Sequence, residues 1–405
     1  MNRGSQDSPY ACLRLATALL LMTIGGVGMY AMIVALPPVQ AEFGVDRGAA
    51  SLPYTLTMVG FGIGGVMMGR LSDRFGVVVP VLTGGICLGL GFIAAGMAPS
   101  LTLFALAHGL LIGFLGSSST FAPLVADISQ WFVRHRGIAV GICASGNYLA
   151  GAIWPPVLQH FFDTVGWRAT YIGVGVFSLV TVLPLALTMR RRPPPAPSTA
   201  VSQETRDRHA RPLGLTPNTL MVLLAAAGVG CCVAMSMPQV HIVAYCGDLG
   251  YGAARGAEML AVMLGFGVIS RLISGWISDR IGGLRTLLFG SVLQGIALFM
   301  FLPFDSLISL YVVSAMFGLF QGGLVPAYAL IVREYFPPGQ AGWRTGVVLM
   351  ATLFGMAFGG WMSGVIFDLT GSYQMAFANG LMWNLVNVLI ALWLLMRPGR
   401  RVAHA

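Results

Sequence analysis

Runs of apolar residues, separated by short polar segments, repeat from one end of the chain to the other. A helix needs about 20 such residues to span a bilayer, and each run is long enough. The runs lack the alternation of apolar and polar positions that a strand of a membrane barrel shows. The pattern therefore predicts twelve membrane-spanning helices, at residues 14–36, 53–71, 77–97, 101–126, 137–160, 168–188, 217–241, 255–278, 284–303, 307–332, 343–366 and 373–396.

The longest polar segment, residues 190–216, leaves six predicted helices on either side. It begins with three Arg followed by three Pro and has no apolar period, which is typical of a flexible linker. We therefore expect an N-terminal six-helix bundle in residues 1–189, a cytoplasmic linker in residues 190–216 and a C-terminal six-helix bundle in residues 217–405.

Composition supports a protein that lies almost entirely in a membrane. Of the 405 residues, 56% are hydrophobic and 9% are charged, whereas soluble domains are about 25% charged. The net charge of +9 could indicate a nucleic-acid partner, but the distribution of charge argues against one. With both termini in the cytoplasm, every Arg lies on the inner side except Arg47, Arg168 and Arg255 outside and Arg271 within the membrane. This positive-inside bias predicts a multi-pass protein of the bacterial inner membrane with no nucleic-acid partner.

No constellation for catalysis or metal binding is visible in the sequence. The six His and six Cys are scattered without the spacing of a metal site. The phosphate-binding loop of an ATPase needs a Lys, and the chain has none. We therefore expect no cofactor, no metal and no enzymatic activity, so a membrane enzyme is disfavoured, as is a receptor.

The two halves of the chain repeat each other. The octet GRLSDRFG at residues 69–76 ends the second predicted helix, and GWISDRIG at residues 275–282 ends the eighth. A second repeat reads FDTVG at residues 162–166 and FDLTG at residues 367–371. Parallel repeats joined by a linker indicate two bundles that bind a substrate between them, near the middle of the membrane.

The first octet resembles the signature loop of the major facilitator superfamily, and the repeated octet and the division into two sets of six helices fit the same family. The resemblance covers essentially the whole chain. It implies an all-α membrane protein with the major facilitator fold, in which 12 transmembrane helices form two pseudo-symmetric six-helix bundles. It also implies an inner gate made by Asp73, Arg74, Arg136, Asp279 and Arg280. The alternative is that these charges only mark the membrane boundary.

Arg271 lies well inside the eighth predicted helix, about 12 Å from the end that carries Asp279 at ~1.5 Å per residue. An Arg within the bilayer costs at least about 2.5 kcal/mol and cannot lose its proton. Residues 267 and 275, one turn away, are both Gly, so the alternatives are an acid on another helix, a substrate anion, or a side chain that snorkels to the membrane interface. Nearly all acidic residues lie at helix ends, and the guanidinium fork matches a carboxylate, so we favour a carboxylate substrate.

An Arg on the eighth helix resembles the monocarboxylate transporters and the related oxalate/formate exchangers. The exchangers also carry a Lys on the eleventh helix, and the animal carriers have a Lys on the first helix and an acid one turn before the Arg. This chain lacks all three, which places it nearer the bacterial members. The resemblance implies that Tyr328 contacts the carboxylate and that His241 lies near the outer mouth.

Polar and aromatic residues on other predicted helices could complete the site. The substrate-binding residues that we predict are Arg271, Tyr328, Asn147, Tyr148, Tyr30, His241, Ser118 and Gln321. Each has a structural alternative: a Tyr can pack its ring, Asn147 can bridge helices, His241 can lie at the interface and Ser118 can permit close packing.

These features predict a secondary transporter that works by alternating access. The expected substrate is a monocarboxylate such as lactate or pyruvate, coupled to protons, with Arg271 holding the carboxylate and Asn147 and Tyr328 orienting it. The alternatives are an anion exchanger of the oxalate/formate type and a proton-coupled drug or metabolite exporter. Residues 145–151 lack the Gly-Pro pair of the exporters, and Arg271 would repel a cationic drug. We expect the transporter to function as a monomer in the lipid bilayer.

Overall fold

The computed structural model of the protein describes residues 7–132, 136–191 and 212–397. Across these ranges the regular structure is entirely helical, and twelve helical stretches are long and apolar enough to cross a membrane. The prediction of an all-α membrane protein with twelve spans is confirmed. The predicted linker, residues 190–216, falls largely outside the described residues.

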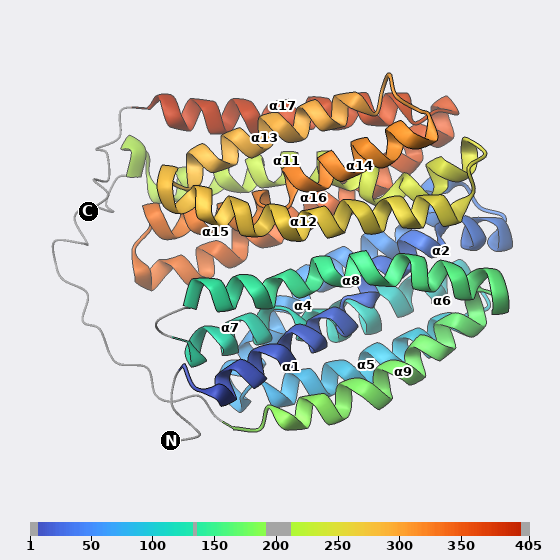
Figure 1. Cartoon of the computed structure of the whole chain (residues 1–405), viewed down its shortest axis with the longest axis horizontal. Helices are drawn as coiled ribbons and strands as arrows, with labels where there is room; N and C mark the ends of the chain where they lie inside the picture. Colours follow the sequence, from blue (N-terminus) through green and yellow to red (C-terminus); the bar gives the residue numbers. More distant parts are fainter. Residues whose placement is uncertain (1–6, 133–135, 192–211, 398–405) are drawn as a thin grey trace.

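The helices run along the long axis of the molecule and form two bundles, which lie one above the other in Figure 1. The first bundle consists of α1 (Pro9–Gly25), α2 (Val27–Phe43), α3 (Arg47–Ala50), α4 (Leu52–Phe75), α5 (Val78–Gly96), α6 (Leu101–Leu106), η1 (Ala107–Gly116), η2 (Ser117–Thr120), α7 (Ala122–Trp131), α8 (Arg136–Val165) and α9 (Trp167–Thr188). After η3 (Pro212–Gly214), the second bundle consists of α11 (Pro217–Asp248), α12 (Ala253–Ile281), α13 (Gly283–Met300), α14 (Leu307–Gln321), α15 (Leu324–Tyr335), α16 (Pro338–Thr370) and α17 (Gln374–Met396).

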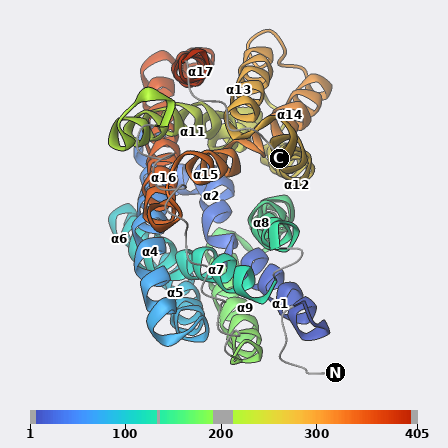
Figure 2. The same ribbon diagram turned by 90° about the vertical axis from the view of Figure 1, so that its left-hand side faces the viewer.

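Both bundles begin and end at the same end of the molecule, where α1 starts, α9 ends, α11 starts and α17 ends (Figure 1). Following the predicted topology, we call this the inner end and the opposite end the outer end. Figure 2 looks along the helices from the inner end and shows α8 and α2 of the first bundle facing the second.

Three of the predicted ranges contain an internal break that the apolar pattern did not predict. α1 and α2 meet at Gly26, the fourth span changes to the π-helical η1 and the 3₁₀-helical η2, and α14 and α15 meet at Gly322 and Gly323. A Cβ on Gly26 would lie 2.5 Å from the Cβ of Ala150, and one on Gly322 would lie 2.3 Å from the carbonyl oxygen of Gly267. These two breaks therefore occur where another helix packs directly on the backbone.

Several helices extend beyond their predicted ends. α11 continues to Asp248 instead of ending at residue 241, and α2 continues to Phe43 instead of ending at residue 36. The sequence Gln239-Val240-His241 suggested the membrane boundary, but all three residues are buried in the protein. Their polar groups therefore lie in a protein interior and do not end the helix.

A buried ion pair joins α1 and α7 at the inner end of the first bundle. Arg14 donates from Nε to Oδ2 of Asp127 at 2.6 Å and from Nη2 to Oδ1 at 2.8 Å. Its guanidinium also lies 4.8 Å from the ring centroid of Trp131 and donates to the hydroxyl of Tyr10 at 3.2 Å. The two charged side chains are 1% and 5% exposed, so each depends on the other for compensation.

We expect Asp127→Asn to lower the free energy of unfolding by about 3–5 kcal/mol, because it leaves the buried Arg14 guanidinium without a counter-charge. Thermal unfolding in detergent would show this as a lower melting temperature. Asp73→Asn is the control: Asp73 is exposed at the same end, and a surface substitution changes stability by about 0.5 kcal/mol or less. Equal melting temperatures for the two variants would contradict the role of the pair.

Candidate functional site

The guanidinium of Arg271 bridges the two bundles. Arg271 is on α12, yet its Nη1 donates to the carbonyl oxygen of Ala144 on α8 at 2.7 Å. Its Nε lies 3.4 Å from the carbonyl oxygen of Gly322, at the break between α14 and α15. The carbon of the guanidinium lies 4.2 Å from the ring centroid of Tyr148, one turn beyond Ala144 on α8. Three helical elements from both bundles therefore position this charge.

The antiparallel helices α8 and α12 contact each other through successive pairs of residues. The pair of Ala144 and Arg271 lies nearest the inner end. Nearer the outer end, Gly151 of α8 leaves room for Leu264 of α12, because a Cβ on Gly151 would lie 2.2 Å from Leu264 Cδ1. In the next pair towards the inner end, Gly267 of α12 leaves room for the ring of Tyr148. A Cβ on Gly267 would lie 2.4 Å from this ring. The small residues bring the helices together, and the Tyr148 ring then lies beneath the guanidinium.

The contacts of Arg271 leave most of its hydrogen-bonding capacity free. A guanidinium has five N–H donors, and the described protein atoms accept from only two of its nitrogens. No acidic side chain of the described residues forms a salt bridge with it, in contrast to Arg14, Arg47, Arg168 and Arg255. The side chain is only partly buried. A partly accessible cation with unused donors, held between two bundles, is suited to bind an anion.

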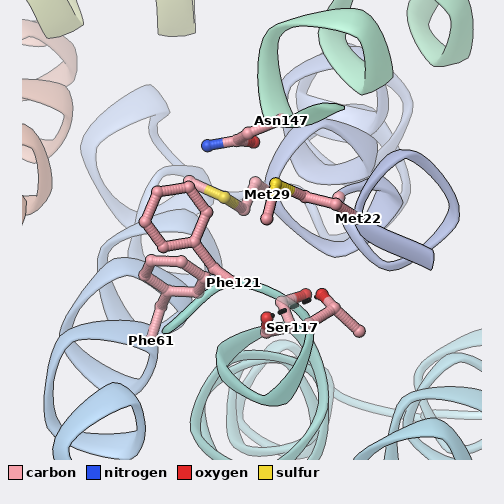
Figure 3. A pocket seen from close by; sticks show the side chains of 8 residues that line it. Met22, Met29, Phe61, Ser117, Phe121 and Asn147 are labelled. Atoms are coloured by element: carbon pink, nitrogen blue, oxygen red, sulfur yellow. Dashed lines mark hydrogen bonds between the residues drawn. The ribbon is translucent and has the colours of Figure 1, made fainter. Parts of the chain in front are cut away.

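A small pocket lies beside Asn147, the residue that precedes Tyr148 on α8 (Figure 3). It is open to the surroundings, and its cavity volume is only about 10 Å³. Its lining residues are Met22, Gly26, Met29, Phe61, Ser117, Thr120, Phe121 and Asn147.

Three polar side chains line the pocket, and they differ in whether their hydrogen bonds are satisfied. The hydroxyls of Ser117 and Thr120 donate to backbone carbonyls, at 3.0 Å to Gly25 and 2.9 Å to Ser117, so both are satisfied. The buried Oδ1 of Asn147 has no hydrogen-bond partner among the described residues. Such a group costs free energy unless something hydrogen-bonds to it, so the amide is available to a ligand.

Two further predicted residues lie near the contact between the bundles. The ring of Tyr30 on α2 packs on Gly151, where a Cβ would lie 2.7 Å from Tyr30 Cζ. Gln321 ends α14 beside Gly322 and is fully buried, and both polar atoms of its amide lack a hydrogen-bond partner in the described structure. Arg271, Tyr148, Asn147, Tyr30 and Gln321 therefore lie on elements that meet at or beside the Arg271 guanidinium.

Three predicted residues are engaged elsewhere. The hydroxyl of Tyr328 donates to Oδ1 of Asn387 on α17 at 2.8 Å, so it is used inside the second bundle. Ser118 donates to the carbonyl of Phe114 in the preceding turn at 2.6 Å, and its neighbour Ser117 lines the pocket instead. His241 is hydrogen-bonded through both ring nitrogens, to Tyr373 Oη at 2.9 Å and to the carbonyl of Gly360 at 2.8 Å. The structure therefore gives no support for these three as carboxylate ligands.

Four of the five predicted gate residues form no salt bridge in the described part of the structure. Asp73, Arg74, Asp279 and Arg280 are all exposed at the inner end. Arg74 lies over the ring of Phe75 at 5.1 Å and Arg280 over the ring of Trp276 at 3.9 Å, so each stays with its own bundle. Arg136 begins α8, and its side chain lies outside the described part of the structure.

The outer end, in contrast, is held by charged contacts that the sequence did not reveal as functional. Arg47 of the first bundle forms a salt bridge with Asp248 of the second, and Asp368 accepts hydrogen bonds from the first bundle. Tyr373, in the turn before α17, accepts from Arg47 Nη1 at 3.1 Å. Burial raises the pKa of Tyr373, so its hydroxyl keeps its proton. Only the second repeat, which contains Asp368, gave a signal for this region.

The sequence did not single out the apolar side chains that line the pocket. Met22, Met29, Phe61 and Phe121 are apolar residues within apolar runs, and nothing in the sequence distinguishes them from residues that face lipid or the core. Their common feature, proximity to Asn147, exists only in three dimensions.

Comparison with known proteins fits this geometry. Residues 18–312 and 259–404 match the Major Facilitator Superfamily. Monocarboxylate transporter 13 of Bos taurus is 30% identical over 315 residues, which cover 76% of this chain and 71% of that protein. The chain belongs to the major facilitator superfamily, in its monocarboxylate transporter branch. A bacterial relative of the transporter, the MFS-type transporter YcxA of Bacillus subtilis, is 25% identical over 359 residues, or 84% of each chain.

Solved structures share the fold of this transporter. A crystal structure of a bacterial homologue of the human lysosomal transporter Spinster has a TM-score of 0.73, with 14% identity, and covers 96% of this chain and 97% of that chain. A peptide transporter in complex with sulfate has a TM-score of 0.73, with 13% identity, over 97% and 96% of the chains. The predicted major facilitator fold is confirmed. This is a multi-pass membrane transporter for a small molecule and not an enzyme.

We expect Gly267→Ala to disturb the transporter at the Arg271 site. The added Cβ would lie 2.4 Å from two ring carbons of Tyr148, and overpacking of this kind costs about 1–3 kcal/mol. Gly265→Ala is the control, since its nearest neighbour, the Ala152 Cβ, would lie 4.0 Å away. Melting temperatures of the two variants measure the difference, and an unchanged value for Gly267→Ala would contradict the close contact between Tyr148 and α12.

Proposed function

We propose that the transporter moves a small monocarboxylate across the bacterial inner membrane, with both termini in the cytoplasm. The observation that carries this proposal is the Arg271 guanidinium, which bridges both bundles without an acidic partner among the described residues. A carboxylate placed there would accept parallel hydrogen bonds from the free N–H groups and compensate the charge. The names of several relatives, such as monocarboxylate transporter 11 of Homo sapiens at 29% identity, support the same substrate class.

The geometry suggests how such an acid would lie. Its carboxylate would bind Arg271 above the ring of Tyr148, and the Asn147 amide would take a hydroxyl or keto group of the substrate. Asn147 is three residues beyond Ala144, or about 4.5 Å along the helix at ~1.5 Å per residue, which suits adjacent groups of a 2-hydroxy or 2-keto acid. The apolar part of the substrate would lie against the Met and Phe side chains at the opening of the pocket. Tyr328 is left out of this site because its hydroxyl is bonded to Asn387.

We propose that this structure represents a state closed at the outer end and open at the inner end. The salt bridge of Arg47 supports the first part, and the exposed charges of the two inner octets support the second. In the opposite state, Asp73, Arg74 and Arg136 with Asp279 and Arg280 would join the bundles at the inner end. The linker, residues 190–216, would let two bundles of residues 1–189 and 217–405 move relative to each other within one monomer.

Proton symport is the coupling that we propose, because a proton can accompany the anion across the membrane and neutralise the loaded carrier. Exchange of one anion for another is the second candidate, and a specific observation favours it. The described residues place no acidic side chain in a salt bridge with Arg271, so no carboxyl group beside it would bind the proton. The two mechanisms differ in what drives uptake, and this difference can be measured.

Uptake of labelled lactate, pyruvate, formate and oxalate into proteoliposomes tests the proposed function. We expect accumulation of a monocarboxylate in response to an inward proton gradient. Uptake that requires a trapped counter-anion would establish exchange instead. No uptake of any acid under either condition would reject the proposal that Arg271 binds a substrate carboxylate.

Substitution of Arg271 tests the residue that carries the proposal. We expect Arg271→Gln to reduce uptake by about 10- to 100-fold, because hydrogen bonds to a charged group contribute about 1.5–3 kcal/mol. Arg271→Lys should fall between this variant and wild type, since it keeps the charge and loses the planar fork. Arg255→Gln, an exposed Arg at the outer end, is the control. Wild-type rates for Arg271→Gln would exclude the proposed site.

The pocket gives a separate prediction about the apolar part of the substrate. We expect Phe121→Ala to raise the KM for phenylpyruvate by about tenfold more than the KM for pyruvate, because it removes apolar surface that only the larger acid would contact. Phe114→Ala is the control, since Phe114 lies on the same span outside the pocket. Equal changes for both acids would show that the tail does not lie against Phe121.

A further inference from the structure

The second sequence repeat ends two helices, α8 and α16, at the outer end of the molecule, each before a glycine. Gly166 and Gly371 follow these helices with positive φ values of 84° and 68°. The amide of each glycine donates to the carbonyl of a Phe four residues earlier, at 3.1 Å in Phe162 and 2.7 Å in Phe367. In both copies an Asp follows the Phe, so the pseudo-symmetry of the fold places Asp163 and Asp368 in equivalent positions.

Asp368 uses its carboxylate to join the two bundles. Its Oδ1 accepts from the backbone amide of Arg47 at 2.9 Å, and its Oδ2 accepts from the amide of Gly48 at 2.6 Å. Both amides belong to α3, at the start of the second span of the first bundle. A carboxylate that accepts two backbone N–H groups forms strong, charge-assisted hydrogen bonds.

The side chain of Arg47 adds a second set of contacts across the same boundary. Its Nη1 and Nη2 both bond to the carboxylate of Asp248, with Nη2 to Oδ1 at 3.2 Å. Its guanidinium also lies 4.1 Å from the ring centroid of Phe367 and donates to Tyr373. Arg47 is 8% exposed, whereas Asp248 is exposed, so the ion pair is buried on the Arg47 side only.

Two glycines allow α3 and α16 to approach closely enough for these bonds. A Cβ on Gly364 would lie 2.9 Å from Ser51 Oγ and 3.0 Å from the Cα of Gly48. A Cβ on Gly48 would lie 2.8 Å from Val365 Cγ2. Any side chain at either position would therefore push the two bundles apart at the outer end.

The equivalent position on α8 is different in chemistry and in contacts. Four residues before the Asp, α16 has Gly364, whereas α8 has Gln159. The Gln159 amide donates from Nε2 to Oδ1 of Asp163 at 2.8 Å, so this Asp bonds to its own helix. At the spacing that relates the two octets, Arg47 corresponds to Ala253, which carries no charge. The second copy therefore lacks the glycine and the Arg, and its carboxylate bonds within its own helix and not to the other bundle.

We propose that the outer gate of the transporter is a one-sided ion latch, formed by Arg47, Asp248 and Asp368 where α3 meets α16. At a second contact between the bundles, where α8 meets α12, the described residues form no salt bridge, and the pairs of small and large residues that end at Arg271 hold the helices together. Opening of the outer end therefore begins by breaking the bonds of Asp368 and Arg47. Asp163, although it has the same place in the repeat, does not take part.

A buried cysteine in the latch measures its opening. Ser51 is fully buried against Gly364, so Ser51→Cys reacts with a membrane-impermeant maleimide on intact cells only when this boundary opens. The rate is compared with that of the protein without the added cysteine. We expect Asp368→Asn to raise the labelling rate by about tenfold or more, since it weakens two charge-assisted hydrogen bonds. Asp163→Asn should leave it within about twofold of the parent.

A second variant, Gly364→Ala, tests the latch without changing a charge. It also keeps the proposal testable if Asp368→Asn does not fold. Gly364→Ala inserts a methyl group between α16 and α3 and should raise the labelling rate in the same direction. Size-exclusion chromatography of each variant shows whether the protein is folded. Equal labelling of the Asp163 and Asp368 variants would overturn the one-sided latch, and so would an unchanged rate in both Asp368→Asn and Gly364→Ala. Because no transport is measured, the result does not depend on the identity of the substrate.

Discussion

The structure depends on the placement of a guanidinium that cannot lose its charge inside a chain that is 56% hydrophobic. Arg271 is compensated in this state by two backbone carbonyls and the face of Tyr148, and by no acidic side chain of the described residues. Carbonyl groups and an aromatic face stabilise a cation less than a carboxylate does. The site is therefore organised around a charge that an anionic ligand would stabilise, and it lies where both bundles contribute contacts.

The chain uses two other solutions for a buried Arg elsewhere. Arg14 forms a bidentate pair with Asp127 inside one bundle, where the partners move together. Arg47 pairs with Asp248 across the bundles, where the partners separate if the outer end opens. The three Arg residues share a side chain and differ in what their partner does during a conformational change. This difference separates a structural pair, a latch and a candidate binding group.

The contact between α8 and α12 connects the candidate site to the movement of the bundles. Gly151 and Gly267 receive large side chains from the opposite helix, and Arg271 completes the series with its bond to Ala144. A relative rotation of the bundles must change these contacts, and with them the position of Tyr148 beneath the guanidinium. Binding of an anion to Arg271 would thus act on the same surface that the bundles use to move.

The sequence by itself determined the twelve spans, their division into two bundles and the presence of a charge, Arg271, within the eighth span, because hydrophobic length and the cost of a charge in a bilayer are local properties. Tertiary structure alone decided which residues surround that charge. It engaged Tyr328 with Asn387, gathered Met22, Met29, Phe61 and Phe121 beside Asn147, and brought Asp368 to the amides of Arg47 and Gly48. These contacts join residues far apart in the chain, and each depends on a glycine, a helix break or a close approach that apolar periodicity does not encode.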